Sequence, residues 1–132
     1  MNVVLDASAV LAYLRDEPGG EVVEEAFVAG ALISSVNWAE VLTRVVEGGG
    51  DPEHTRRAMV EGGVLGEGLV VHPLDEMQAL KIARLRPLTR AAGLSLADRT
   101  CLALAASLDL TALTADRAWA DLGLRVRVEL IH

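Results

Sequence analysis

Short runs of β-branched and aliphatic residues alternate along this chain with longer stretches of helical apolar spacing, and this alternation restricts the fold most. We expect strands at residues 2–6, 31–35, 69–74, 110–115 and 124–130. We expect helices at residues 7–17, 20–29, 36–47, 52–61, 76–92, 95–108 and 117–122. Strands separated by helices in this order predict right-handed β-α-β units, and hence an α/β fold with a parallel sheet covered on both faces.

The length of 132 residues predicts a single domain over residues 1–132. Apolar residues make up 52% of the chain and aromatic residues only 3%, so small and branched aliphatic side chains must fill the core. No run approaches the roughly 18 apolar residues of a membrane span, so we expect no membrane association and a cytoplasmic location. The one cysteine, Cys101, is expected to pack as a small hydrophobic residue.

Four acidic residues are expected at one edge of the predicted sheet, where parallel strands end and the following helices begin. Asp6 ends the first strand, and Asp116 follows the fourth. Asp98 lies in the first turn of the helix before that fourth strand, and Glu40 lies one turn into the third helix. The net charge of −7 disfavours nonspecific nucleic-acid binding through a basic surface, but it is compatible with acids that bind cations.

Helical spacing predicts that Asp98 and Glu40 lie on the inward faces of their helices. Around Asp98 the expected inward residues are Ala97, Cys101, Leu102, Ala105 and Leu108, with Arg99, Thr100 and Ser107 on the outer face. Around Glu40 the expected inward residues are Val36, Ala39 and Thr43.

Each acid also has a purely local explanation. Asp6 and Asp116 are typical N-caps of the helices that follow them. Asp98 completes an S-x-x-D capping box that begins at Ser95. Glu40 has no capping role, and its alternative is a solvated helix face, although its neighbours in the sequence are apolar.

Four carboxylates at one edge repel one another and raise each other's pKa unless a cation compensates them. Mg²⁺ and Mn²⁺ prefer oxygen ligands and are commonly bound by carboxylates together with substrate phosphates. The pattern therefore predicts a divalent-metal site for phosphoryl chemistry. Other candidates are weaker: His54, His72 and His132 lack ligand spacing, and Ser8 and Ser35 lack a base partner and are expected to be helix caps.

Four segments of the chain, in their order and spacing, resemble the PIN domain, and within it the VapC-type toxins of toxin–antitoxin pairs. The segments are VVLDASAVLAYL (3–14), ISSVNWAEV (33–41), GLSLADRTCLALA (93–105) and LTALTADRAWADL (110–122). The resemblance covers essentially the whole chain. It implies a three-layer α/β/α sandwich with a central parallel sheet, a metal-dependent endoribonuclease activity, a homodimer, and inhibition by a cognate antitoxin protein.

The resemblance also implies roles for individual residues. The family's acidic residues fall on Asp6, Glu40, Asp98 and Asp116, which are then expected to bind one or two Mg²⁺ or Mn²⁺ ions that activate water for RNA phosphodiester hydrolysis. Thr114 matches a polar position that often supports the metal site, and is otherwise an ordinary strand residue. Asp121 either adds to the site or lies on a solvated helix face. The arginines near this edge, Arg15, Arg99 and Arg117, either bind RNA phosphates or form surface ion pairs.

Two other enzyme and signalling classes share a parallel sheet with acids at strand ends, but they fit the sequence less well. A phosphoacceptor signalling domain needs two acids after the first strand and a lysine at a later strand end, whereas Lys81 lies within a helix. A haloacid-dehalogenase-type phosphatase needs D-x-D, and residues 6–8 are Asp-Ala-Ser. The open alternatives are a housekeeping PIN nuclease without an antitoxin and a non-catalytic PIN-like binding domain.

Overall fold

A computed structural model describes residues 2–132 of the chain. Five strands form one parallel sheet in the order β3-β2-β1-β4-β5. The strands are β1 (Val3–Leu5), β2 (Ala31–Ser34), β3 (Leu69–His72), β4 (Thr111–Thr114) and β5 (Val128–Leu130). The helices are α1 (Ala7–Leu14), α2 (Gly20–Ala29), α3 (Ser35–Glu47), α4 (Pro52–Glu61), α5 (Glu76–Thr89) and α6 (Leu96–Leu108), with a 3₁₀ turn, η1 (Arg117–Trp119). The predicted α/β fold with a parallel sheet is confirmed.

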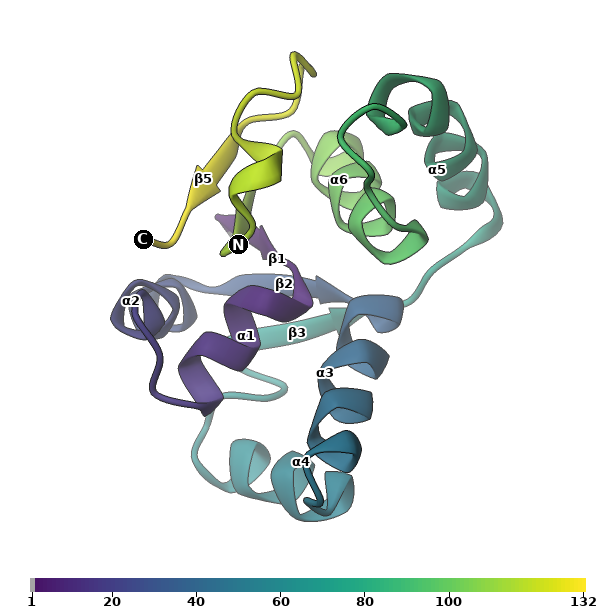
Figure 1. Cartoon of the computed structure of the whole chain (residues 1–132). Coiled ribbons are helices and arrows are strands. Elements are labelled where there is room, and N and C mark those ends of the chain that lie inside the picture. Colours follow the sequence, from purple (N-terminus) through teal and green to yellow (C-terminus); the bar gives the residue numbers. More distant parts are fainter. Residues whose placement is uncertain (1) are drawn as a thin grey trace.

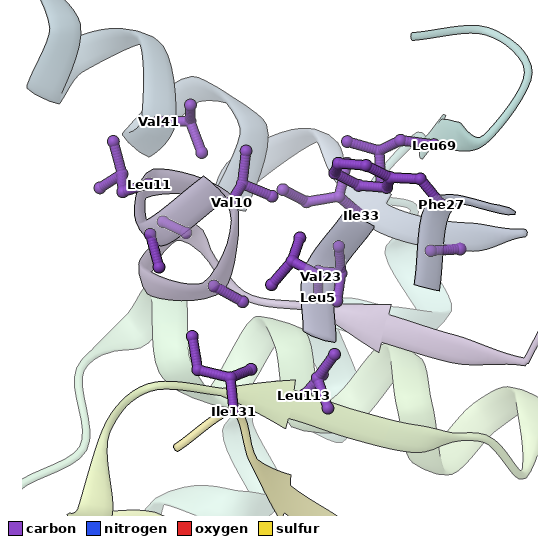
Figure 2. Close-up of a cluster of buried hydrophobic side chains, with 14 of the residues drawn as sticks. Leu5, Val10, Leu11, Val23, Phe27, Ile33, Val41, Leu69, Leu113 and Ile131 are labelled. Carbon is purple, nitrogen blue, oxygen red and sulfur yellow. The ribbon is translucent and has the colours of Figure 1, made fainter. Parts of the chain in front are cut away.

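Two hydrophobic cores lie on opposite faces of this sheet. Successive strand residues alternate between them, so that Leu5 belongs to the first core and Val4 to the second. The first core joins the sheet to α1 and α2 and includes Val10 and Phe27, which Figure 2 labels. The second core joins the opposite face to α6 and includes the fully buried Trp119. Figure 1 shows the resulting layers, with α5 and α6 together on one side of the sheet and α1 and α2 on the other.

The strand register brings the carboxyl ends of the central strands level with one another. Leu5, the last residue of β1, pairs with Ile33 of β2 on one side and with Leu113 of β4 on the other. The residues that follow these three strands therefore lie at the same edge of the sheet. This edge carries the residues from which the sequence predicted a functional site.

Most element starts agree with the prediction because they depend on local caps. The side chains of Asp51, Asp75 and Ser95 accept hydrogen bonds from backbone N–H groups at the starts of α4, α5 and α6. Within residues 2–132 no helix has the length and apolar character needed to cross a membrane.

Several element ends are shorter than predicted. Helix α5 ends at Thr89 instead of residue 92, where a turn with a positive φ at Gly93 follows and the Leu94 N–H donates to Thr89 O. Strand β5 spans only Val128–Leu130, because its one neighbour is the four-residue strand β4. The helix expected at 117–122 is the short turn η1.

The predicted inward faces of two helices were partly wrong. On α6, Thr100 is buried although it was expected outside, and Leu108 is 41% exposed although it was expected inside. The middle of α6 is buried on nearly all sides because α5 and α3 pack on it as well as the sheet. On α3, the expected inward residues Ala39 and Thr43 are exposed, whereas the side chains that the structure buries are Asn37 and Val41.

Candidate active site

Asp6 is the most buried acid at the carboxyl edge of the sheet, with 5% of its surface exposed. It follows β1 and caps α1, so its Oδ1 accepts a hydrogen bond of 2.9 Å from the backbone N–H of Ala9. The Ser8 hydroxyl donates to the same carboxylate, at 2.7 Å from Oδ1 and 2.9 Å from Oδ2. The Thr114 hydroxyl donates to Oδ2 at 2.5 Å. The predicted capping role is therefore present, together with contacts that reach across to β4.

Burial raises the pKa of Asp6 from 3.8 to about 6. The hydrogen bonds from Thr114, Ala9 and Ser8 act in the opposite direction, and the negative charge of Asp98 adds to the increase. Among the described residues no basic side chain forms an ion pair with Asp6. The carboxylate is thus buried and hydrogen-bonded, but its charge is not compensated.

Thr114 and Ser8 link the ends of β1 and β4. The fully buried Thr114 donates to Asp6, and its Oγ1 accepts a hydrogen bond of 3.0 Å from the backbone N–H of Asp116. Ser8 Oγ accepts a hydrogen bond of 2.9 Å from the backbone N–H of Ala115. Ser8 was expected near the acids as a helix cap. The capping expectation was wrong, because Asp6 is the N-cap of α1 and Ser8 lies inside the helix, where its hydroxyl donates to the Asp6 carboxylate.

Asp98 is half-buried in the first turn of α6 and forms the predicted capping box with Ser95. Asp98 Oδ2 accepts a hydrogen bond of 2.8 Å from the Ser95 N–H, and the Asp98 N–H donates to Ser95 Oγ at 3.1 Å. The charge of Asp98 raises the pKa of Asp6, and the pKa of the buried Cys101 thiol is raised by burial first and by both acids in addition. The structure thus brings Asp6 and Asp98 within electrostatic reach of each other.

Asp116 and Glu40 reach this edge from other directions. Asp116 is exposed at the start of η1, where its Oδ1 accepts a hydrogen bond of 2.9 Å from the Ala118 N–H. The backbone N–H of Asp116 donates to the Thr114 hydroxyl, which in turn donates to the Asp6 carboxylate. Glu40 is half-buried on α3 and lines a cleft that also reaches Ser8 and Ala115. Asp121 is exposed, and within the described chain no hydrogen bond or ion pair joins it to these acids.

The donor set fits a hard divalent cation without forming a complete cage. Within residues 2–132 no group of three or more His, Cys, Asp or Glu side chains is close enough to hold a metal ion by itself. Mg²⁺ is commonly bound by one or two carboxylates, with water and substrate oxygens as its other ligands. The uncompensated Asp6 carboxylate beside Asp98 meets that smaller requirement, and Asp98 Oδ1 accepts no hydrogen bond from the described residues.

Asn37 is a buried polar residue near the acids that the sequence analysis missed. It is 1% exposed, and its Nδ2 donates a hydrogen bond of 2.9 Å to the carbonyl oxygen of Ala97. Asn37 lies three residues before Glu40 on α3, and Ala97 precedes Asp98 on α6. This bond therefore ties together the two helices that carry Glu40 and Asp98. The three-residue spacing between Asn37 and Glu40, which places both on one face of the helix, was the signal in the sequence that could have identified Asn37.

The other candidates lie in different surroundings. Arg15 lines the same cleft as Glu40, whereas Arg99 Nη1 donates to the carbonyl oxygen of Ile82 on α5. Arg117 is exposed beside Asp116.

Ser35 does not cap α3, since Ser34 does so, and Ser35 Oγ accepts a hydrogen bond of 3.1 Å from the Leu74 N–H. Of the histidines, His132 lines the cleft, His54 lies on α4, and His72 Nδ1 is 3.4 Å from Gln78 Nε2.

Comparison with known proteins gives one family and several similar structures. A family model described as PIN domain matches residues 3–124. No curated protein matches the chain. VapBC from Salmonella typhimurium, solved bound to DNA, is similar at 18% identity and a TM-score of 0.73, with 100% of this chain and 99% of that chain covered.

Two further structures share the fold. A toxin–antitoxin complex from Klebsiella pneumoniae has 18% identity and a TM-score of 0.75, with 99% of this chain and 98% of that chain covered. VapC20 from Mycobacterium tuberculosis, a toxin that cleaves the sarcin-ricin loop, has 14% identity and a TM-score of 0.71, with 96% and 99% covered. The TM-scores show that these structures share the fold of this chain. Because the family model extends over nearly the whole chain, the protein belongs to the PIN domain family.

Proposed function

We propose that this chain is a single-domain, metal-dependent endoribonuclease that acts as the toxin of a VapBC-type toxin–antitoxin pair. The observation that carries the proposal is the buried, uncompensated carboxylate of Asp6 beside the charge of Asp98. A carboxylate in this state binds a divalent cation favourably, because the cation offsets both the burial and the repulsion between the acids.

Some residues of the site would bind the metal ion, and others orient the carboxylates that bind it. Asp6 and Asp98 hold Mg²⁺ or Mn²⁺, and Asp116 and Glu40 extend the acidic edge toward substrate. Ser8 and Thr114 donate to Asp6 and fix the orientation of its carboxylate. A bound divalent ion lowers the pKa of water and stabilises negative charge on a phosphate.

RNA is the proposed substrate because the M. tuberculosis protein of the same fold is a toxin that cleaves the sarcin-ricin loop. A cognate antitoxin is the proposed partner because the Salmonella and Klebsiella structures are toxin–antitoxin complexes. We propose a homodimer as the assembled form, on the family resemblance.

The direct experiment is RNA cleavage by the purified chain with Mg²⁺ or Mn²⁺, in parallel with the variant Asp98→Asn. We expect cleavage that EDTA abolishes. Asp98→Asn should lower the rate by about 100-fold or more, since even outer partners of metal sites contribute about 10- to 100-fold. The control is Asp75→Asn, which alters the exposed cap of α5 after the outer strand β3, two strands away from β1 in the sheet.

Equal cleavage by Asp98→Asn and the parent chain would place the activity elsewhere or in a contaminant. Binding of Mn²⁺ without cleavage of any RNA would identify a non-catalytic PIN-like domain. Growth arrest on expression, lost with Asp6→Ala, distinguishes a toxin from a housekeeping nuclease. A small reading frame next to the gene, with a DNA-binding N-terminus, is the matching genomic observation.

A further inference from the structure

A cleft of about 480 Å³ lies between α1, α3 and the end of β4. It is lined by Ser8, Arg15, Glu17, Glu40, Arg44 and Ala115, together with apolar residues of α1, Pro18 and His132. Its volume is within the usual range for small-ligand sites. Two arginines and two glutamates give this cleft a mixed lining, in contrast to the apolar groove between α5 and α6.

The two arginines have nitrogen donors available for an anion. Within residues 2–132 no carboxylate lies within 4.0 Å of the Arg15 guanidinium, and Arg44 pairs only through Nε with Glu47 Oε1, at 3.7 Å. The side chains of that pair are 57% and 62% exposed, so the pair is weak. Arg44 lies one turn after Glu40 on α3 but forms no ion pair with it. Guanidinium groups whose N–H donors have no strong carboxylate partner suit a phosphate, which accepts two parallel hydrogen bonds.

The cleft shares two residues with the surroundings of Asp6. Ser8 Oγ donates to the Asp6 carboxylate and accepts from the Ala115 N–H, and both Ser8 and Ala115 line the cleft. The main chain of Arg15 is fixed at the end of α1, where its backbone N–H donates to Leu11 O at 2.9 Å, and its side chain lines the cleft. A polyanion bound by Arg15 and Arg44 therefore passes directly beside the acidic edge.

We propose that this cleft is a phosphate subsite for single-stranded RNA, in which Arg15 and Arg44 bind a phosphate next to the one that is cleaved. The proposal rests on the proposed ribonuclease function. It gives a chain with a net charge of −7 two guanidinium groups beside the site that can bind a phosphate, although Glu17 and Glu40 balance their charge within the cleft. Glu17 opposes the phosphate, so RNA binding should improve when its charge is removed.

The test compares Arg15→Ala, Arg44→Ala and the double variant with the parent. Cleavage kinetics on a single-stranded RNA should show KM raised about five- to tenfold by each single change, with kcat within about twofold. The dependence of log(kcat/KM) on log salt should become shallower by about 0.7 in the double variant, the amount expected for one lost phosphate contact on a single strand. Arg44→Lys should recover part of the KM, and Glu17→Gln should lower it.

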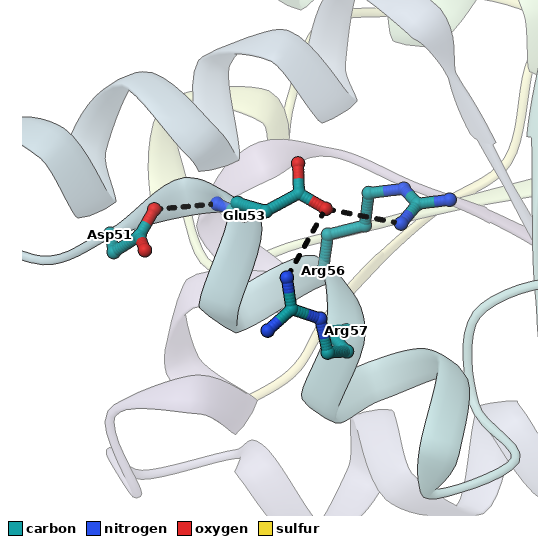
Figure 3. A network of polar contacts seen from close by, with 4 residues as sticks. All are labelled: Asp51, Glu53, Arg56 and Arg57. Atoms are coloured by element: carbon teal, nitrogen blue, oxygen red, sulfur yellow. Dashed lines mark hydrogen bonds and ion pairs between the residues drawn. The ribbon is translucent and has the colours of Figure 1, made fainter.

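The matched control is Arg56→Ala on α4. Arg56 pairs with Glu53 at 3.5 Å with side chains 54% and 60% exposed, much as Arg44 pairs with Glu47. Figure 3 shows this pair on α4, and neither residue lines the cleft. Removing Arg56 should change neither KM nor the salt dependence. If Arg15→Ala and Arg44→Ala behave like Arg56→Ala, the subsite is overturned.

Direct binding separates this proposal from the nuclease proposal. Fluorescence anisotropy in EDTA measures binding of a labelled ten-nucleotide RNA without cleavage. A parent that binds through Arg15 and Arg44 but does not cleave with Mn²⁺ contradicts the nuclease and supports the subsite. A parent that cleaves, with arginine variants unchanged in KM and binding, supports the nuclease and contradicts the subsite. A parent that neither binds nor cleaves contradicts both.

Discussion

At the scale of single residues, the central feature of the site is the buried carboxylate of Asp6. Its carboxylate accepts hydrogen bonds from Ser8, Ala9 and Thr114, yet burial dominates and raises its pKa to about 6. Between pH 3.8 and about 6 the folded chain holds a proton that the unfolded chain has released. Stability is therefore highest below this window and is lost as the pH rises through it, by roughly 3 kcal/mol at about 1.4 kcal/mol per pH unit.

Replacing Asp6 by Asn should remove this cost in the metal-free protein. We expect Asp6→Asn in EDTA to raise the free energy of unfolding at pH 7.5 by about 1–3 kcal/mol and to abolish the loss of stability between pH 4 and 6. Urea denaturation across this pH range makes the measurement. Asp75→Asn, at an exposed cap, should not stabilise the chain. An Asp6→Asn variant that is no more stable than the parent at pH 7.5 would contradict the cost assigned to burial.

Residues at strand ends could be predicted from the sequence, but side-chain partners could not. Asp6 and Asp98 follow from position in a β-α-β pattern, because the topology alone determines the edge at which they lie. Arg44 and Asn37 were missed, because their directions depend on how α3 packs against α1 and α6. The outward direction expected for Arg99 was wrong for the same reason, since its guanidinium is bound to a carbonyl of α5.

At the scale of elements, α3 and α6 are joined by one hydrogen bond, which the buried Asn37 donates. Asn37 Nδ2 donates to Ala97 O, and in residues 2–132 no other side-chain hydrogen bond links these two helices. Because Ala97 precedes Asp98 and Asn37 lies one turn before Glu40, the bond sets the relative position of two acids. Its loss should therefore affect cation binding as well as folding.

The variant Asn37→Leu keeps a similar volume but cannot donate a hydrogen bond. We expect it to lower the free energy of unfolding by about 1–3 kcal/mol and the affinity for Mn²⁺ by about tenfold. The control is Thr89→Val, which removes the buried hydrogen bond from Thr89 Oγ1 to Leu85 O on α5, away from the site. Thr89→Val should destabilise the chain without changing Mn²⁺ affinity. Equal Mn²⁺ affinities in Asn37→Leu and the parent would contradict a role of Asn37 in cation binding and leave it a role in folding alone.

Helix starts could be predicted more reliably than helix faces. The caps at Asp51, Asp75 and Ser95 are local, so three or four residues determine them. The buried faces of α3 and α6 depend on two or more packing partners, which a single helical period does not describe.

At the scale of the whole molecule, the strand order β3-β2-β1-β4-β5 creates the site by ending β1, β2 and β4 at one edge. The sequence predicted a parallel sheet from its alternation of elements, but it did not predict this order, which depends on which strands pair. Helix α6 forms the second core and also carries Asp98 at its first turn. Packing of α6 and the position of the acid are thus coupled.

Two leucines on α6 test the packing of this layer. Leu102 is fully buried in the second core, whereas Leu108 in the last turn is 41% exposed. We expect Leu102→Ala to lower the free energy of unfolding by about 2–5 kcal/mol and Leu108→Ala to change it by less than about 1 kcal/mol. Chemical denaturation of both variants provides the comparison. Similar losses for the two would contradict the packing described for α6.

The most direct measurement of the central claim is thermal unfolding of the metal-free chain at pH 7.5 with increasing Mn²⁺. A cation that binds only the folded state raises the melting temperature, with a stabilisation of about 2.7 kcal/mol when free Mn²⁺ reaches a hundred times its Kd. We predict a saturable rise for the parent and for Asp75→Asn, and no rise for Asp6→Asn or Asp98→Asn. No shift in the parent, or an equal shift in Asp6→Asn, would contradict a cation site at the carboxyl edge of this sheet.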